Sequence, residues 1–111
     1  MVQSPDIDVS ELADRLEHAA VLIDVRNPDE HEEANIAAAI LIPLDQLPER
    51  IDEIPDADEV LVICRSGGRS AAACEFLAAN GRNPVNVSGG MLAWIDSGRD
   101  IAGAMGTSPT E

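Results

Sequence analysis

One stretch of the sequence predicts a strand, a loop and a helix built around a single thiol: Val60-Leu61-Val62-Ile63-Cys64-Arg65-Ser66-Gly67-Gly68-Arg69-Ser70. Its first four residues are apolar and mostly β-branched, as in a buried parallel strand, and Cys64 follows at the strand's end. A loop with two glycines and two arginines comes next, and Ser70 is the expected N-cap of an alanine-rich helix. Backbone N–H groups and a helix N-terminus would then converge on the sulfur and favour its thiolate form. We therefore expect Cys64 to be a nucleophile.

Expected strands and helices alternate on both sides of this stretch. The strands are expected at 21–25, 40–42, 60–63 and 85–87. The helices are expected after Ser10 as an N-cap, from Pro28 with Asn27 as its cap, in two pieces at 44–47 and 49–54, and over 70–80 and 91–96. This order is typical of an α/β domain with a mostly parallel sheet. We assign residues 1–9 to an N-terminal extension, 9–101 to one domain and 102–111 to a flexible C-terminal tail.

Three features fall at or near the ends of expected strands. They are Asp24, Cys64 and the Ser88-Gly89-Gly90 turn. Sites in parallel sheets lie outside the carboxyl ends of the strands, so we expect these features to line one rim. A buried carboxylate needs a partner, for which Arg26 and Arg69 are the candidates. We interpret Asp24 and Arg26 as structural support for the site.

The charge of the chain is strongly negative and unevenly distributed. The formal net charge is −14, and 17 of the 21 acidic residues lie in residues 1–60. The basic residues are seven arginines, with no lysine. No basic face exists for nucleic acid, and the acidic half is expected to be a solvated surface, or alternatively a docking face for a basic partner. The polar start of the chain and the lack of a long apolar run predict no signal peptide and no membrane span, which makes the cytoplasm the default location.

The cysteines and histidines predict one reactive thiol and no metal site. Cys64 and Cys74 are too few for a disulfide framework, and two distant histidines, His18 and His31, complete no zinc site. Cys74 is expected to be a core residue of the helix after the loop, with a resolving thiol as the alternative. Trp94 is expected to be a core anchor. With no histidine near Cys64 in sequence, the nucleophile is expected to need no general base.

The sequence resembles the single-domain rhodanese family of sulfurtransferases over residues 9–100. The matching segments are Leu22-Ile23-Asp24-Val25-Arg26, Ala39-Ile40-Leu41-Ile42-Pro43-Leu44, Val62 to Ser70, and Val87-Ser88-Gly89-Gly90-Met91-Leu92-Ala93-Trp94. One segment departs from the family. Its usual Gly-His-Ile-Pro-Gly-Ala is here Ala34-Asn35-Ile36-Ala37-Ala38-Ala39, which puts the usual turn geometry in doubt there but leaves the cysteine loop intact.

The resemblance implies a three-layer rhodanese-like domain, with a mostly parallel sheet flanked by helices, and a sulfur-transfer reaction without a cofactor. Cys64 would take the outer sulfur of a donor such as thiosulfate, hold it as a persulfide and pass it to cyanide, a thiol or a protein partner. The backbone of the loop would stabilise the sulfur through the residues Arg65, Ser66, Gly67, Gly68, Arg69 and Ser70. Arg65 and Arg69 would orient an anionic donor, and Arg69 could also pair with a carboxylate. We expect a monomer or a weak dimer.

Two other functions stay open at this point. Phosphatases and arsenate reductases of related architecture resemble a Cys-x5-Arg loop, which is one residue longer than the Cys-x4-Arg spacing from Cys64 to Arg69. The shorter loop suits a bare sulfur better than a tetrahedral oxyanion. The second alternative is a non-catalytic binding or regulatory module with the same fold.

Overall fold

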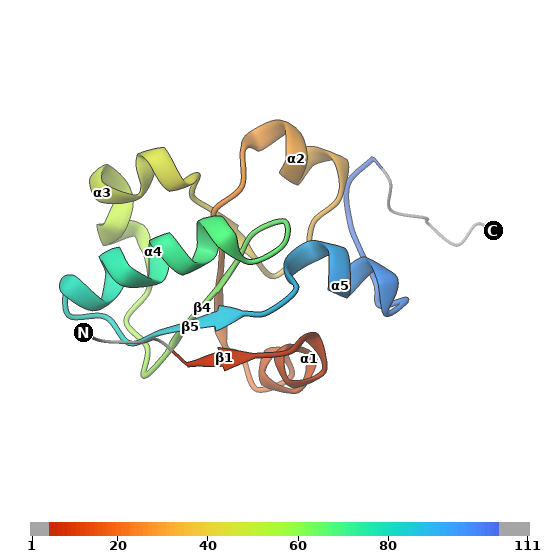
Figure 1. The fold of residues 1–111 in the computed structure, drawn as a ribbon, viewed down its shortest axis with the longest axis horizontal. Coiled ribbons are helices and arrows are strands. Elements are labelled where there is room, and N and C mark those ends of the chain that lie inside the picture. The colour runs from red at the N-terminus through yellow and green to blue at the C-terminus, as the bar shows by residue number, and fades with distance from the viewer. Residues whose placement is uncertain (1–4, 105–111) are drawn as a thin grey trace.

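The computed structural model of the protein describes residues 5–104 and contains a five-stranded parallel sheet (Figure 1). The strand order is β1-β5-β4-β2-β3. The strands are β1 (Asp6–Ile7), β2 (Val21–Asp24), β3 (Ile40–Leu41), β4 (Val60–Ile63) and β5 (Pro84–Val87). All four strand pairs are parallel, so the predicted α/β class with a mostly parallel sheet is confirmed.

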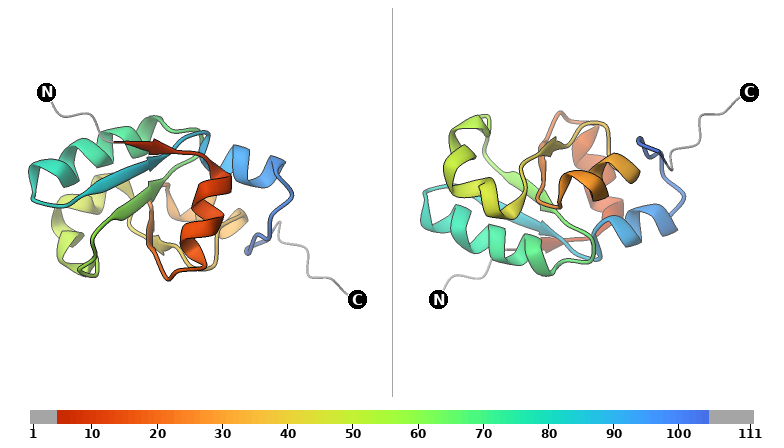
Figure 2. Two further views of the ribbon diagram at one scale, coloured as in Figure 1. Left: turned by 90° about the horizontal axis from the view of Figure 1, so that it is seen from below. Right: turned by 90° about the horizontal axis from the view of Figure 1, so that it is seen from above.

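Helices cover both faces of this sheet, as the two further views show (Figure 2). The helices are α1 (Val9–Leu16), α2 (Pro28–Glu33), α3 (Leu47–Arg50), α4 (Gly68–Ala79) and α5 (Gly90–Asp96), with short 3-10 turns at Leu44–Gln46 and Ile51–Glu53. The core on one face joins α4 and the 44–54 segment to the sheet, and the core on the other face joins α1 and α5 to it. The resulting three layers agree with the expected architecture.

Alternation along β4 explains how one strand serves both cores. Val60 and Val62 face the α4 side, whereas Leu61 and Ile63 face the α1 and α5 side. All four are buried, because successive side chains of a strand point to opposite faces of the sheet. Cys64 continues this pattern and lies in the α4 core, 1% exposed.

Two predicted helix caps are wrong. Helix α1 begins earlier than expected, with Asp8 as its N-cap instead of Ser10; the Asp8 carboxylate accepts a hydrogen bond from the backbone N–H of Glu11 at 2.9 Å. Helix α4 begins at Gly68, so Ser70 lies inside the first turn and is not the cap. The N-cap is Gly67, whose φ of +124° is open to glycine and strained for other residues.

The two ends of the described chain are hydrogen-bonded to the domain. Residues 6–7 of the expected extension form β1, which pairs with β5. Ala102 of the expected tail exchanges backbone hydrogen bonds with Asn35, and the N–H of Ala104 donates to the carbonyl of Glu32. Residues 105–111 of that tail lie outside the described residues. No helix within residues 5–104 has the length and apolar character needed to cross a bilayer.

Candidate active site

The sulfur of Cys64 lies at the base of the loop between β4 and α4, where hydrogen-bond donors point at it. The backbone N–H of Gly67 donates to Sγ at 3.1 Å, and the hydroxyl of Ser70 lies 3.3 Å from the same sulfur. Gly67 has a positive φ of +124° at this turn, a backbone conformation that glycine adopts without strain. The fold therefore places a single thiol in a small cage of donors at the carboxyl end of the central strand.

These donors lower the pKa of the Cys64 thiol. Burial by itself raises that pKa, because it removes water from the charged form. Hydrogen bonds from the Ser70 hydroxyl and from the backbone N–H groups of Ser70, Gly67 and Ser66 outweigh burial and bring the pKa below its ordinary value. The predicted thiolate-stabilising loop thus has a physical basis in named donors.

The hydroxyl of Ser70 can accept a hydrogen bond from the neutral thiol of Cys64 or donate one to its thiolate. In the neutral state the thiol can donate to Oγ of Ser70, which itself donates to the carbonyl of Gly67 at 3.1 Å. A hydroxyl rotates freely, so it can turn its proton to the sulfur once the thiolate forms. The role expected for Ser70 as a helix cap is thereby replaced by a contact with the reactive atom.

Replacing Ser70 with alanine is expected to raise the pKa of Cys64, because the thiolate loses its side-chain donor while burial still disfavours the charge. The rate of Cys64 alkylation by iodoacetamide, measured as a function of pH, should show a midpoint about one unit higher than in the wild type. Ser66→Ala is the matched control: it removes an exposed hydroxyl of the same loop but keeps the backbone N–H. Equal midpoints for Ser70→Ala and wild type would contradict this assignment.

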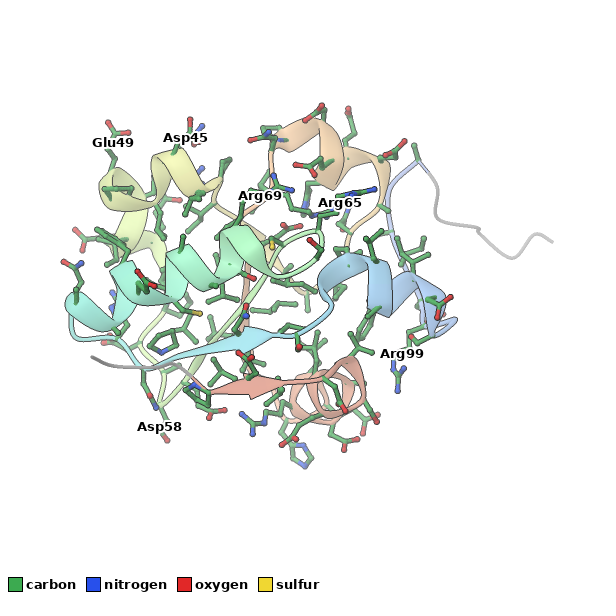
Figure 3. All side chains as sticks on the ribbon, in the orientation of Figure 1. Asp45, Glu49, Asp58, Arg65, Arg69 and Arg99 are labelled. Carbon is green, nitrogen blue, oxygen red and sulfur yellow. The ribbon has the colours of Figure 1, made fainter. Side chains whose placement is uncertain are left out.

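The two arginines of the loop have different surroundings. Arg69 makes a two-pronged ion pair with Glu30 of α2, with N–O distances of 2.6 and 2.8 Å. Arg65 is exposed and forms no ion pair with any residue from 5 to 104. Both side chains lie between the Cys64 loop and α2 (Figure 3). The expectation that Arg69 pairs with a carboxylate is confirmed, and that carboxylate is Glu30.

This ion pair shifts the pKa values of both partners. The Arg69 hydrogen bond holds the pKa of Glu30 at about 2, against the opposing effect of partial burial and with help from the backbone N–H of Asn27. Glu30 in turn raises the pKa of Arg69, to which the charges of Cys64 and Asp24 also contribute. Arg69 is therefore a fixed positive charge close to the sulfur across the whole physiological pH range.

A buried ionic cluster supports the site at the end of β2. The carboxylate of Asp24, fully buried, accepts hydrogen bonds from Nε and Nη2 of Arg26 and from the Arg26 backbone N–H, at 2.7–3.2 Å. Arg26 also donates to the carbonyls of Ala34 and Glu30. The pairing of Asp24 with Arg26 is confirmed, whereas Arg69 is not the ion-pair partner of Asp24.

Sequence reasoning missed a third member of this cluster. Nδ1 of His31 lies 3.0 Å from Oδ2 of Asp24. Burial raises the pKa of Asp24, and the hydrogen bonds from Arg26 and His31 together bring it below the ordinary value. Nothing in the sequence singles out His31, which stands seven residues from Asp24 in an acidic run.

The Gly89-Gly90 turn closes the rim on the other side of the loop. Two N–H groups in the first turn of α5, those of Met91 and Leu92, donate to the carbonyls of Cys64 and Arg65 at 2.8 and 3.1 Å. A Cβ atom on Gly90 would lie 2.5 Å from both carbonyl oxygens. The predicted rim of Asp24, Cys64 and residues 88–90 is thus present.

Gly68 has no positive φ and starts α4, and a Cβ atom there would meet no atom within 4 Å. Cys74 and Trp94 are buried in the two cores, as predicted. Cys64 and Cys74 form no disulfide, and the described residues contain no cluster of three or more His, Cys, Asp or Glu side chains suited to a metal ion.

Comparison with known proteins gives a consistent result. The family model described as "Rhodanese-like domain" matches residues 8–97. A protein named "Sulfurtransferase" from Allochromatium vinosum is 36% identical over 91% of this chain and 97% of its own length. The putative sulfurtransferase YtwF of Bacillus subtilis is 37% identical over 80% of this chain and 88% of its own.

Solved structures show the same similarity in three dimensions. A rhodanese-related protein from Thermoplasma volcanium superimposes with a TM-score of 0.82 at 37% identity, and covers 88% of this chain and 97% of its own. A rhodanese-like domain protein from Staphylococcus aureus gives a TM-score of 0.76 at 36% identity, over 81% of this chain and 90% of its own.

Proposed function

The chain belongs to the rhodanese-like domain family, and on this premise we propose that it is a sulfurtransferase that carries sulfur as a persulfide on Cys64. The observation that carries the proposal is the donor cage around Sγ, formed by the N–H of Gly67 and the hydroxyl of Ser70. Donors in this position stabilise a sulfur anion before the reaction, and they would do the same for the terminal sulfur of a persulfide.

The proposed reaction has two displacements at sulfur. In the first, the Cys64 thiolate attacks the outer sulfur of a donor such as thiosulfate; the donor's S–S bond breaks and sulfite leaves with the electron pair. In the second, cyanide, a thiolate or a protein cysteine attacks the terminal sulfur of the persulfide, and the Cys64 thiolate leaves. No cofactor takes part in either step.

We assign the recognition of an anionic donor to the positive side of the loop. Arg65 is exposed next to the nucleophile and free of ion pairs with described residues, so it can turn to a bound anion. The ion pair with Glu30 holds Arg69 in place, so Arg69 supplies a positive charge at a fixed position and is not a mobile ligand. A protein acceptor in the cytoplasm would approach the same exposed rim.

The experiment that tests this proposal is the intact mass of the reduced protein after incubation with thiosulfate. We expect the wild type to gain one sulfur atom, which cyanide or a thiol then removes. Cys64→Ser should gain none, whereas Cys74→Ala should gain it as the wild type does, which places the sulfur on Cys64. A folded, reduced wild type that gains no sulfur from thiosulfate or from a persulfide donor would overturn the proposal.

A further inference from the structure

We propose that His31 is a positioning residue for the Cys64 site: it fixes helix α2 to the sheet through Asp24, and α2 then holds Arg69 beside the sulfur through Glu30. The inference deepens the proposed function and rests on it only for its kinetic consequence. Its main test measures the chemistry of the thiol and does not depend on sulfur transfer.

Helix α2 has no apolar anchor of its own. It consists of six residues, none of which is buried. A helix this short gains little stability by itself, so polar contacts must determine where it lies. On its sheet side α2 is held by two sets of side-chain contacts. Arg26 donates to the backbone carbonyls of Glu30 and Ala34, and His31 is hydrogen-bonded to Asp24, whose carboxylate is fully buried and also bound by Arg26.

Two neighbouring side chains of α2 reach two different parts of the fold. Glu30 binds Arg69 in the first turn of α4, and His31 binds Asp24 at the end of β2. Helix α2 therefore links the end of a central strand to the catalytic loop. The far side of α2 is fastened separately, by the hydrogen bond from the N–H of Ala104 to the Glu32 carbonyl. Arg26 binds only backbone carbonyls of this segment, so His31 is the α2 side chain that is tied to the end of β2.

The consequence for the sulfur is electrostatic. The interactions that raise the pKa of Arg69 include the charges of both Cys64 and Asp24, which places its guanidinium within their range. Figure 3 shows Arg69 reaching from the start of α4 toward α2. If α2 shifts, Glu30 and Arg69 shift with it, and an anionic reagent approaching Cys64 meets less positive charge.

The test compares the alkylation of Cys64 by iodoacetate and by iodoacetamide. The two reagents have nearly the same size, so limited access to the sulfur cancels in the ratio of their rate constants, which then reports the charge felt by an anion. We expect His31→Phe, which keeps a ring but removes the donor, to lower this ratio about threefold or more. His31→Gln, whose amide can donate to Asp24, should stay close to the wild type.

A double-mutant cycle with Arg69→Ala decides whether His31 acts through Arg69. If it does, His31→Phe should leave the ratio unchanged in the Arg69→Ala background. A wild-type ratio in His31→Phe, a loss in His31→Gln as large as in His31→Phe, or an undiminished effect without Arg69 would overturn the proposal. If His31→Phe does not fold, His31→Ala takes its place in the same cycle.

Steady-state kinetics with thiosulfate distinguish a failure of the proposed function from a failure of the proposed role of His31. If the protein transfers sulfur from thiosulfate, His31→Phe should raise KM for that anion and leave kcat near the wild-type value, because donor binding and not the displacement is weakened. If the wild type transfers no sulfur, the proposed function fails, while the alkylation ratios still decide the role of His31.

Discussion

Gly90→Ala is expected to lose about 3 kcal/mol or more of unfolding free energy, since it combines a strained backbone with a clash against the Cys64 loop. The φ of Gly90 is +57°, and a Cβ there would lie 2.5 Å from the carbonyl oxygens of Cys64 and Arg65. Both obstacles are backbone atoms, which cannot rotate away as a side chain can. Relief requires α5 to move off the loop, which breaks the hydrogen bonds from Met91 and Leu92.

Gly98→Ala separates the cost of the strained backbone from the cost of the steric clash. Gly98 has a φ of +80°, but a Cβ there would meet no atom within 4 Å. Its loss should be limited to the cost of the left-handed backbone, about 1–2 kcal/mol. Chemical denaturation of both variants measures the difference, and equal losses would show that the contact between α5 and the loop is looser than the structure has it.

Asp24→Ala is expected to be the most damaging change among the charged residues, at about 3–5 kcal/mol, because it leaves the buried guanidinium of Arg26 without its counter-charge. The side chain of Arg26 is only 5% exposed, so water cannot replace the carboxylate. Glu53→Ala is the matched control. It removes a carboxylate from an exposed ion pair with Arg50, for which less than about 1 kcal/mol is expected. Urea unfolding at neutral pH gives both values, and similar losses would contradict the expected difference.

Asp24 also makes the unfolding free energy depend on pH, and the sign of this dependence follows from the pKa of its carboxyl group. Burial raises the pKa of Asp24, the hydrogen bonds of Arg26 and His31 lower it, and the result lies below the ordinary value. A depressed folded-state pKa stabilises the protein above the unfolded-state value of about 3.9, and this stabilisation is lost as the pH falls through the folded-state value. The gap in unfolding free energy between wild type and Asp24→Ala should therefore be constant at neutral pH and shrink below about pH 4.

The sequence was sufficient to predict the strand–loop–helix unit around Cys64, because its signals are local. Four consecutive apolar residues before the cysteine match β4 to the residue, and the strands at 21 and 85 are correct within one residue. β1 was missed because two residues carry no periodicity, and only pairing with β5 makes them a strand. The predicted N-caps at Ser10 and Ser70 are wrong because both helices begin earlier in the chain. Asp8 is the N-cap of α1, and Gly67, with its positive φ, is the N-cap of α4.

The partners of the charged side chains were predicted less well than the strands. Asp24 and Arg26 are two residues apart, and their pairing could be inferred from the burial expected for that strand. Arg69 and Glu30 are 39 residues apart, in a chain with 21 acidic residues to choose from. Which carboxylate reaches the loop depends on where α2 packs, and this is a property of the tertiary structure alone.

The strand order limits how early the chain can fold while it is being synthesised on the ribosome. Central strand β4 pairs with β5, and β5 pairs with β1, so the first strand made finds its place only after residues 84–87 have been synthesised. The loop of Cys64 receives its last two hydrogen bonds from Met91 and Leu92, which emerge later still. A nascent chain consequently holds its thiol in an unfinished loop until almost the whole domain has left the exit tunnel. The backbone hydrogen bonds of the Cys64 loop are therefore complete only when the fold is complete.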